Sequence, residues 1–407
     1  MAKASHSSAD FHVWIDGDAP ADPRGDRLDR WCVALWSGYP ESDAEGWDQV
    51  GLHIGDPRTD VVTGVLVALD VTEAVLDEAA ELGANLLIAH HPLFFSPLPR
   101  LTPHTASGRL ALKAVRQGCA VLAAHTNVDK AARGTSHPAA QVLDLRDTRP
   151  IRPLPVDPGT DPVKIVTFVP HEYTDDVIRA MAFDGAGIIG NYTECAFVTP
   201  GTGTFRPGLA ANPHVGSPGG REQVAEDRVE MVMHRVDVDA VLHHLRDAHP
   251  YEEVPYDLYP LVRQDRWSDR GLGLIGTLPQ PLPVTEVARR LAEGLPSPHL
   301  RLAARDPQQL IRSVGICGGA GDSLIADLIN PPKVDLFVTG DLKHHVTLDA
   351  MTMGLSLIDA GHFATEDPAM DAVVETLESA RGDLGLTVPI HRSRVTTDPW
   401  TDWRPAP

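Results

Sequence analysis

Cysteine is scarce in this sequence, and long hydrophobic runs are absent from it. Its 407 residues include 4 cysteines with no Cys-x-x-Cys pair, which favours unpaired thiols in a reducing compartment over a disulfide framework. Nowhere do about eighteen apolar residues follow one another, as a membrane-spanning helix requires. The start, MAKASHSSADFHVW, has no apolar signal-peptide core. We therefore expect a cytoplasmic protein with no membrane partner.

Basic residues are also few relative to acidic ones. Lysine and arginine number 35 against 56 aspartates and glutamates, which gives a formal net charge of −21. A surface this acidic repels phosphate backbones, and no Lys/Arg-rich run offsets it, so nucleic acid is disfavoured as a partner. Apolar residues make up 43% and charged residues 22%, values typical of a soluble globular protein. A chain of this length should form two or three domains.

Apolar runs alternate with helical patterns over most of the chain. The runs at 62–71, 85–92 and 119–129 predict buried strands, and helices are expected over 73–82 and 107–117. Asp70 and Glu73 have the spacing of a capping box for the first of these helices. Near-continuous apolar strands that alternate with helices predict a parallel or mixed sheet covered on both faces.

The middle of the chain has a different composition. A Pro-rich stretch near 146–160 predicts a linker, and the elements beyond it follow the order β-α-β-β-α-β of a ferredoxin-like domain. In this domain a Gly-Thr turn within 195–205 could join two strands, and a Gly/Pro-rich loop spans 207–221. The α/β pattern resumes near 271. We therefore predict an α/β fold, a two-lobed mixed-sheet core with an inserted ferredoxin-like α+β domain, divided into a loose leader (1–26), a first lobe (27–146), a linker (147–162), the inserted domain (163–265) and a second lobe (266–407).

Ligand-type side chains gather where the predicted strands end. In open α/β sheets, sites form at the carboxyl ends of strands, and imidazoles beside carboxylates suit Zn²⁺, Fe²⁺ or Mn²⁺. Each motif alone is weak, because a surface histidine pair or an Asn/Asp turn is common. Their occurrence at equivalent strand ends predicts a site for two metal ions, with Glu366 able to bridge them. The expected ligands are His90, His91, Asp129, His362 and Glu366.

At these residues the sequence resembles a known family, the Nif-three-like dinuclear metal centre hexameric proteins, also named GTP cyclohydrolase 1 type 2 homologues. The segment AHPYEEVPYDLYPL (248–261) resembles the P-II-signal-protein-like insert of the long members. Together the motifs span most of residues 28–400 in the family's order. They are WDQVGLHIGDP (47–57), VLVALDVTEAVLDEA (65–79), LLIAHHPLFF (86–95), AAHTNVDKA (123–131), GGAGDSLI (318–325), FVTGDLKHH (337–345), LIDAGHFATE (357–366) and TTDPW (396–400).

The resemblance implies two divalent ions per chain and a toroidal homohexamer built from three dimers. It assigns His91 and Asp129 to one ion, His90 and His362 to the other, and Glu366 to both. Two features depart from the family. Leu274 stands where a cationic residue is usual, and the N-terminal leader has no counterpart. Neither departure touches the expected ligands.

Two adjacent ions suit hydrolysis, and the family name implies opening of the GTP imidazole ring. The candidates for the accompanying proton relay are His125, Asp341 and His345, which could equally serve to support the ligands. Three functions stay open. They are a GTP cyclohydrolase, a metallohydrolase of another nucleotide or phosphoester, and a non-catalytic metal- or ligand-sensing assembly, which a P-II-like insert would suit.

Overall fold

The computed structural model describes residues 25–401 apart from 157, 263–266, 298 and 330–332. The chain divides into two compact units, residues 1–154 with 269–407 and residues 155–268. Most of the predicted leader, residues 1–24, lies outside the described part. Asp26, the last residue of the predicted leader, is not loose, because it belongs to strand β1 (Asp26–Arg27) and accepts hydrogen bonds from the backbone N–H groups of Thr387 and Val388.

A five-stranded sheet forms one half of the first unit. Its strands β4, β5 and β6 are parallel, and β2 joins β6 in the antiparallel direction. Each strand is short because polar or glycine residues interrupt the apolar runs early. The strand order is β17 (Ile390–Arg392), β4 (Val65–Ala68), β5 (Leu86–Ala89), β6 (Ala120–Ala123) and β2 (Gly51–Ile54).

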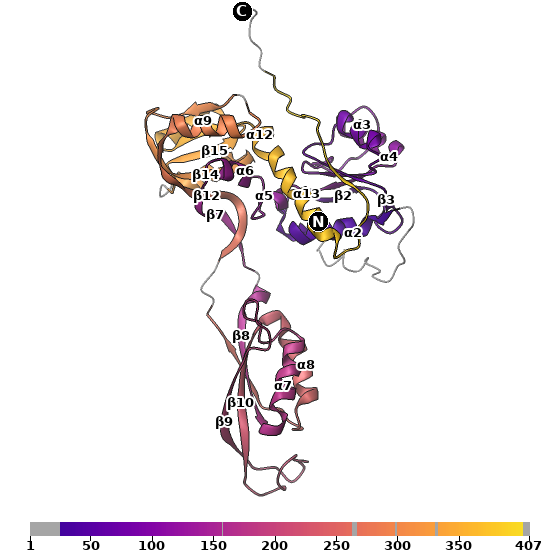
Figure 1. Ribbon diagram of the computed structural model, residues 1–407, viewed down its shortest axis with the longest axis vertical. Helices are drawn as coiled ribbons and strands as arrows, with labels where there is room; N and C mark the ends of the chain where they lie inside the picture. Colours follow the sequence, from indigo (N-terminus) through magenta and orange to yellow (C-terminus); the bar gives the residue numbers. More distant parts are fainter. Residues whose placement is uncertain (1–24, 157, 263–266, 298, 330–332, 402–407) are drawn as a thin grey trace, which may run out of the picture. The chain divides into compact units, whose positions relative to one another are not determined.

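Helices cover both faces of this sheet, as the apolar strands predicted. Along β5, Leu86 and Ile88 pack toward one helix layer, and Leu87 and Ala89 pack toward the other, because successive side chains of a strand point to opposite faces. The layers are visible in Figure 1. One contains α2 (Leu28–Gly38) and α13 (Met370–Arg381), and the other contains α3 (Glu73–Glu81) and α4 (Ala106–Gln117).

The C-terminal segment returns to this first sheet. The sequence analysis placed residues 266–407 together in the second lobe, but β17 pairs with β4, and α13 packs against α2. The reason is apolar burial, since Val373 and Leu377 of α13 belong to the same core as Leu28 of α2. Before α13 begins, Pro368 lies in a 3-10 turn, Asp367–Ala369.

A six-stranded mixed sheet forms the other half of the first unit. Strands β14, β15 and β16 are parallel, β12 is antiparallel to β14, and β13 is antiparallel to β16. The predicted linker, 147–162, is in part a strand of this sheet, because residues 146–155 form β7 beside β12. The strand order is β13 (Arg301–Ala303), β16 (Ser356–Asp359), β15 (Leu336–Gly340), β14 (Leu310–Ala320), β12 (Trp267–Pro283) and β7 (Arg146–Pro155).

The second unit has the predicted chain order, β-α-β-β-α-β, in a four-stranded antiparallel sheet. Its two helices, α7 (Thr174–Phe183) and α8 (Val238–Ala248), lie side by side on one face of the sheet (Figure 1). The likeness to P-II signal proteins stays a prediction. The strand order is β11 (Tyr256–Pro260), β8 (Pro162–Pro170), β10 (Glu222–His234) and β9 (Ala196–Phe205).

One predicted turn in this unit is wrong. The Gly-Thr segment within 195–205 does not join two strands, because β9 runs unbroken from Ala196 to Phe205 and pairs with β10 along this length. Glycine weakens a strand but does not end it when a partner strand supplies the hydrogen bonds. None of the described helices has both the length and the apolar character needed to cross a membrane.

Candidate metal centre

Six side chains at strand ends converge in the first unit. His90 and His91 follow β5, and His125 follows β6. Asp129 ends the short helix α5 (Thr126–Asp129), while His362 and Glu366 begin and end α12 (His362–Glu366), which comes after β16. The five-stranded and six-stranded sheets therefore both contribute. Their ligand-type atoms form three overlapping groups, each lying within 4.8 Å: His90, His91 and His125; His91, His362 and Glu366; and His90, Asp129 and Glu366.

The group of His91, His362 and Glu366 is the tightest. The Nε2 atoms of the two histidines lie 3.3 Å apart, and Glu366 Oε2 lies 3.1 Å from the first and 3.0 Å from the second. Two imidazole nitrogens bound at about 2.0–2.1 Å to one tetrahedral ion lie roughly 3.3 Å apart. The spacing of these three donor atoms therefore suits a single ion held between them.

The second group contains His90, Asp129 and the other oxygen of Glu366. His90 Nε2 lies 3.6 Å from Asp129 Oδ1 and 3.8 Å from Glu366 Oε1. This grouping differs from the pairing that the family resemblance implied. In the structure His91 lies with His362, and His90 lies with Asp129, whereas the assignment of ligands to two ions stays a prediction. Glu366 is the member common to both groups, as expected of a bridging carboxylate.

Two buried polar atoms in the cluster have no hydrogen-bond partner among the described residues, His90 Nε2 and Glu366 Oε2. His90 is 1% exposed and Glu366 is 3% exposed, so bulk water does not satisfy them. An unsatisfied buried polar group costs about 1–3 kcal/mol, more if charged. Metal ions remove that cost by accepting both lone pairs, so the donor set fits the divalent ions that its chemistry suggests.

Carboxylates outside the predicted set orient the histidines. Asp70 Oδ1 lies 2.7 Å from His91 Nδ1, and the Thr397 hydroxyl donates to the other Asp70 oxygen. This corrects the predicted capping box, because Thr72 caps α3 by accepting from the Val75 backbone N–H. Asp70 is thereby free to fix the ring of His91. Partners of this kind also set which imidazole nitrogen faces a metal.

His125 is held in a similar way. Its Nδ1 lies 2.8 Å from Asp48 Oδ1, and Asp48 Oδ2 accepts from the backbone N–H of Thr126 at 3.0 Å. Burial raises the pKa of Asp48, but contacts with His125 and Thr126 outweigh burial and lower this pKa to about 2. Asp48 is therefore ionised at neutral pH and favours an N–H at His125 Nδ1. The signal that could have found Asp48 was its place in the WDQVG motif.

The other two predicted relay residues differ in position. Asp341 has a left-handed backbone conformation, with φ 56°, and its Oδ2 lies 2.8 Å from His362 Nδ1. It is thus placed to support His362. His345 is exposed in α11 (His344–Thr352), makes an edge contact with the ring of His344, and lies outside the three groups of donors. Its part in a relay stays a prediction.

The charges of the cluster depend on one another. Burial lowers the pKa of His91, but close contacts with Asp70 and Glu366 outweigh burial and raise it to about 10. His362 behaves likewise beside Glu366 and Asp341, and its pKa rises to about 9. Burial opposes ionisation of Glu366, yet the neighbouring histidines hold its pKa well below the ordinary range. Without a metal, protons on the imidazoles balance the buried carboxylate.

A close backbone approach completes the site. Gly319, in the GGAGD segment at the end of β14, has φ 61°, and a Cβ there would come within 2.0 Å of Glu366 Oε1. Only glycine allows both this backbone conformation and this contact. This contact between Gly319 and Glu366 was not predictable from the sequence, because the two residues are distant in the chain.

Known proteins are similar to this chain over most of its length. The chain matches the family described as Duf34/NIF3 (NGG1p interacting factor 3) over residues 28–399. A Halalkalibacterium halodurans protein named GTP cyclohydrolase 1 type 2 homolog is 38% identical over 366 residues, which cover 90% of this chain and 95% of that protein. A Mycobacterium bovis protein of the same name is 40% identical over 365 residues, which cover 89% and 93%.

Solved structures share the fold. The crystal structure of a Bacillus cereus protein related to NIF3 superposes with a TM-score of 0.75 at 36% identity, covering 92% of this chain and 99% of that one. A Staphylococcus aureus protein superposes with a TM-score of 0.70 at 27% identity, covering 91% and 97%. The two structures cover 92% and 91% of this chain, so the similarity includes both of its units.

Proposed function

Because this chain belongs to the Duf34/NIF3 family, we propose that its strand-end cluster binds two divalent metal ions and hydrolyses GTP by opening the imidazole ring. The observation that carries the proposal is the pair of donor groups that share Glu366 and leave two buried polar atoms unsatisfied. The relatives named GTP cyclohydrolase 1 type 2 homolog support the choice of substrate.

The residues divide into two ligand sets in this proposal. His91 and His362 would hold one ion, His90 and Asp129 the other, and Glu366 would contact both through its two oxygens. Asp70, Asp341 and Thr135 would then orient the ligands, since Thr135 donates to Asp129 Oδ1 at 2.7 Å. Divalent ions in such a site supply Lewis acidity, which activates water and stabilises developing negative charge.

His125 is the residue best placed to move a proton. Its Nδ1 is occupied by Asp48, and the ring lies with centroids 5.1 Å from His90 and 5.6 Å from His91. Nε2 is therefore the atom available to exchange a proton with the reacting group. Addition of one water at C8 and cleavage of the C8–N9 bond open the imidazole ring and leave a formamide on N7. A second water then breaks the C8–N7 bond and releases formate, and each departing nitrogen must receive a proton. A positioned histidine typically contributes about 10²–10⁴-fold to such a step.

The test is formate release from GTP by freshly metallated protein. Asp129→Ala should lose both metal and formate release, and it serves as the blank. His125→Ala should keep its metal and lose about 10²-fold in turnover. His345→Ala should lose less than about 10-fold, because His345 lies outside the three groups of donors. Equal formate release by the blank would identify a contaminant. Absence of release with every metal tried would reject GTP hydrolysis, and release of phosphate from other nucleotides would favour a different metallohydrolase.

We also propose that the chain assembles into the toroidal homohexamer implied by the family resemblance. Light scattering coupled to size-exclusion chromatography measures the mass directly. A mass six times that of one chain supports the hexamer, and a monomer or dimer at micromolar concentration contradicts it.

A further inference from the structure

The second unit contains a cavity of about 720 Å³ that has no part in the proposed hydrolysis. It lies over the sheet face opposite the helices, because Val229 and Met231 of β10 pack with α7 and α8 while Glu226 and Arg228 line the cavity. Its walls come from segments 206–215 and 251–255. The first segment lies almost entirely in the Gly/Pro-rich loop, and the second lies in the AHPYEEVPYDLYPL segment.

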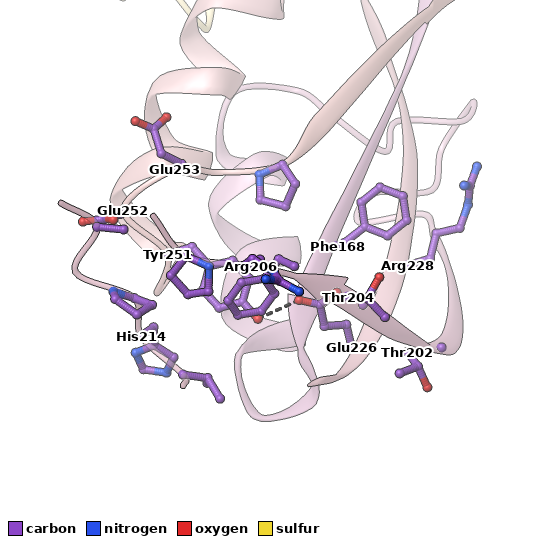
Figure 2. Close-up of a pocket in the computed structure, with 18 of the residues that line it drawn as sticks. Phe168, Thr202, Thr204, Arg206, His214, Glu226, Arg228, Tyr251, Glu252 and Glu253 are labelled. Carbon is purple, nitrogen blue, oxygen red and sulfur yellow. Dashed lines mark hydrogen bonds between the residues drawn. The ribbon is translucent and has the colours of Figure 1, made fainter. Parts of the chain in front are cut away.

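A buried carboxylate lies within this cavity. Glu226 is 9% exposed, and its Oε1 accepts a hydrogen bond of 2.6 Å from the Tyr251 hydroxyl, the dashed line in Figure 2. No described residue forms a hydrogen bond with its Oε2. That oxygen rests against Gly203 of β9, where a Cβ would come within 1.9 Å of it. Tyr251 therefore satisfies Oε1, whereas Oε2, which lies against Gly203, has no hydrogen-bond donor among the described residues.

Aromatic rings gather around Tyr251, the partner of this carboxylate. Tyr251 lies with ring centroids 6.4 Å from Phe205, 6.1 Å from His214 and 4.9 Å from His249, and Phe205, His214 and Tyr251 all line the cavity. Apolar walls lower the local dielectric, so an unbalanced carboxylate costs more there than in water. The faces of aromatic rings attract cations. Both features favour a positively charged group beside Glu226.

The arginines of the cavity do not supply that charge. Arg228 is engaged elsewhere, because its Nε donates to Glu230 at 2.8 Å and its guanidinium lies 5.7 Å from the centre of the Phe168 ring. Figure 2 shows its side chain extending away from Glu226. Arg206 is exposed and forms no ion pair within the described part of the chain. Two further carboxylates, Glu252 and Glu253, also line the cavity. Three acids against two arginines leave the lining negative.

We propose that this cavity binds an organic cation that carries N–H donors, of the amidinium, guanidinium or primary ammonium class, with Glu226 as its counter-ion. The cation donates to Glu226 Oε2, and its apolar part lies against the aromatic rings. A charge-assisted hydrogen bond of this kind is stronger than a neutral one. The site is independent of the metal centre and would give the chain a means of responding to a small cationic metabolite.

The first test uses the full-length chain and four probes of similar shape. Benzamidine is a cation with N–H donors, phenyltrimethylammonium is a cation without them, benzamide is neutral, and benzoate is an anion. Calorimetric titration should give benzamidine at least a tenfold lower Kd than benzamide, phenyltrimethylammonium an intermediate Kd, and benzoate the weakest binding. Equal affinity for benzamidine and benzamide, or tighter binding of benzoate or GTP at this site, overturns the proposal.

Variants assign the binding to the cavity. Glu226→Gln keeps the side-chain shape and removes the charge, so it should weaken benzamidine at least tenfold and leave benzamide unchanged. Asp257→Asn is the matched control. It removes one charge from β11 of the same sheet, at an exposed position outside the cavity lining, and should change neither Kd. Benzamidine binding that survives Glu226→Gln rejects Glu226 as the counter-ion.

A second substitution covers the case in which Glu226→Gln disturbs folding. Gly203→Ala places a methyl group where Oε2 now lies, and it should displace the carboxylate while the strand pairing with β10 is kept. Benzamidine should bind at least threefold more weakly, with benzamide binding as the check that the cavity persists. Unchanged benzamidine binding in Gly203→Ala also counts against the proposal.

Discussion

Glu366 and Glu226 are both buried carboxylates, one in each unit, and their surroundings differ. Three histidine rings surround Glu366, and their contacts hold the pKa of this carboxyl well below its ordinary range. Glu226 has the hydroxyl of Tyr251 and no cationic partner within hydrogen-bonding distance in the described chain. A buried charge must be compensated. In the first unit neighbouring imidazoles compensate the charge of Glu366, whereas in the second unit the proposed cationic ligand would compensate that of Glu226.

The largest expected effect is the loss of metal on removal of Glu366, and removal of Glu226 serves as the comparison. Glu366→Ala takes a donor from both groups of the metal centre, so metal content measured by mass spectrometry should fall from up to two ions per chain to near zero. His91→Ala should lose mainly one ion. Glu226→Ala should leave metal content unchanged, because it belongs to the other unit. Full metal content in Glu366→Ala would show that this glutamate is not a shared ligand.

These two carboxylates also show which parts of the two sites could be predicted from the sequence. Glu366 and the histidines were predictable, because the ends of neighbouring parallel strands meet at one edge and concentrate their side chains there. The grouping of His90 with Asp129 was not predictable from the sequence, since it depends on the directions of the side chains. Glu226 was invisible because it lies inside a long strand, and its partner Tyr251 is distant in sequence. Its recognition needs the register of β9 against β10.

Asp70 and Asp48 illustrate a different failure. An aspartate just before a helix is usually a cap, so local sequence favoured the capping box over a contact with His91 that spans 21 positions. Asp48 lies 77 positions from His125. Partners that orient a ligand are chosen by tertiary structure, and no spacing rule reveals them.

The pH dependence of stability should distinguish the units in metal-stripped protein. The pKa values of His91 and His362 are raised to about 10 and about 9, above the ordinary value of about 6.5 for an unfolded chain. Their stabilising contribution is therefore complete below about pH 6.5 and declines until the folded pKa values are passed. The unfolding free energy of the first unit should therefore fall as the pH rises from about 6.5 to about 10.

Urea denaturation followed across that range provides the measurement. Metal-loaded protein should not show this decline, because bound ions replace the protons on the imidazoles. A metal-stripped first unit whose stability stays constant from about pH 6.5 to 10 would contradict the proton-balanced cluster.

A smaller effect is expected from the residues that orient the ligands. Asp70→Asn preserves the shape beside His91 and removes the charge, which typically lowers metal affinity about 10–100-fold. Asp341→Asn should do less, because the Asp341 side chain is 52% exposed against 30% for Asp70 and water can replace it. Competition with a chelator of known affinity measures both. A greater loss from Asp341→Asn would reverse this ranking of the two supports.

The smallest expected effect concerns the support of Glu226. Tyr251→Phe removes the hydroxyl that donates to Oε1 and leaves the ring against His249. A hydrogen bond to a charged group contributes about 1.5–3 kcal/mol, and partial access to water should reduce the loss to about 1 kcal/mol. The unfolding free energy of the second unit should fall by this amount in urea, whereas metal content of the first unit should not change. Benzamidine should recover more of the lost stability than benzamide does, because its N–H groups can donate to either oxygen of Glu226. Equal stabilisation by the two probes would mean that Glu226 needs no cation, and the contrast between the two carboxylates would then be wrong.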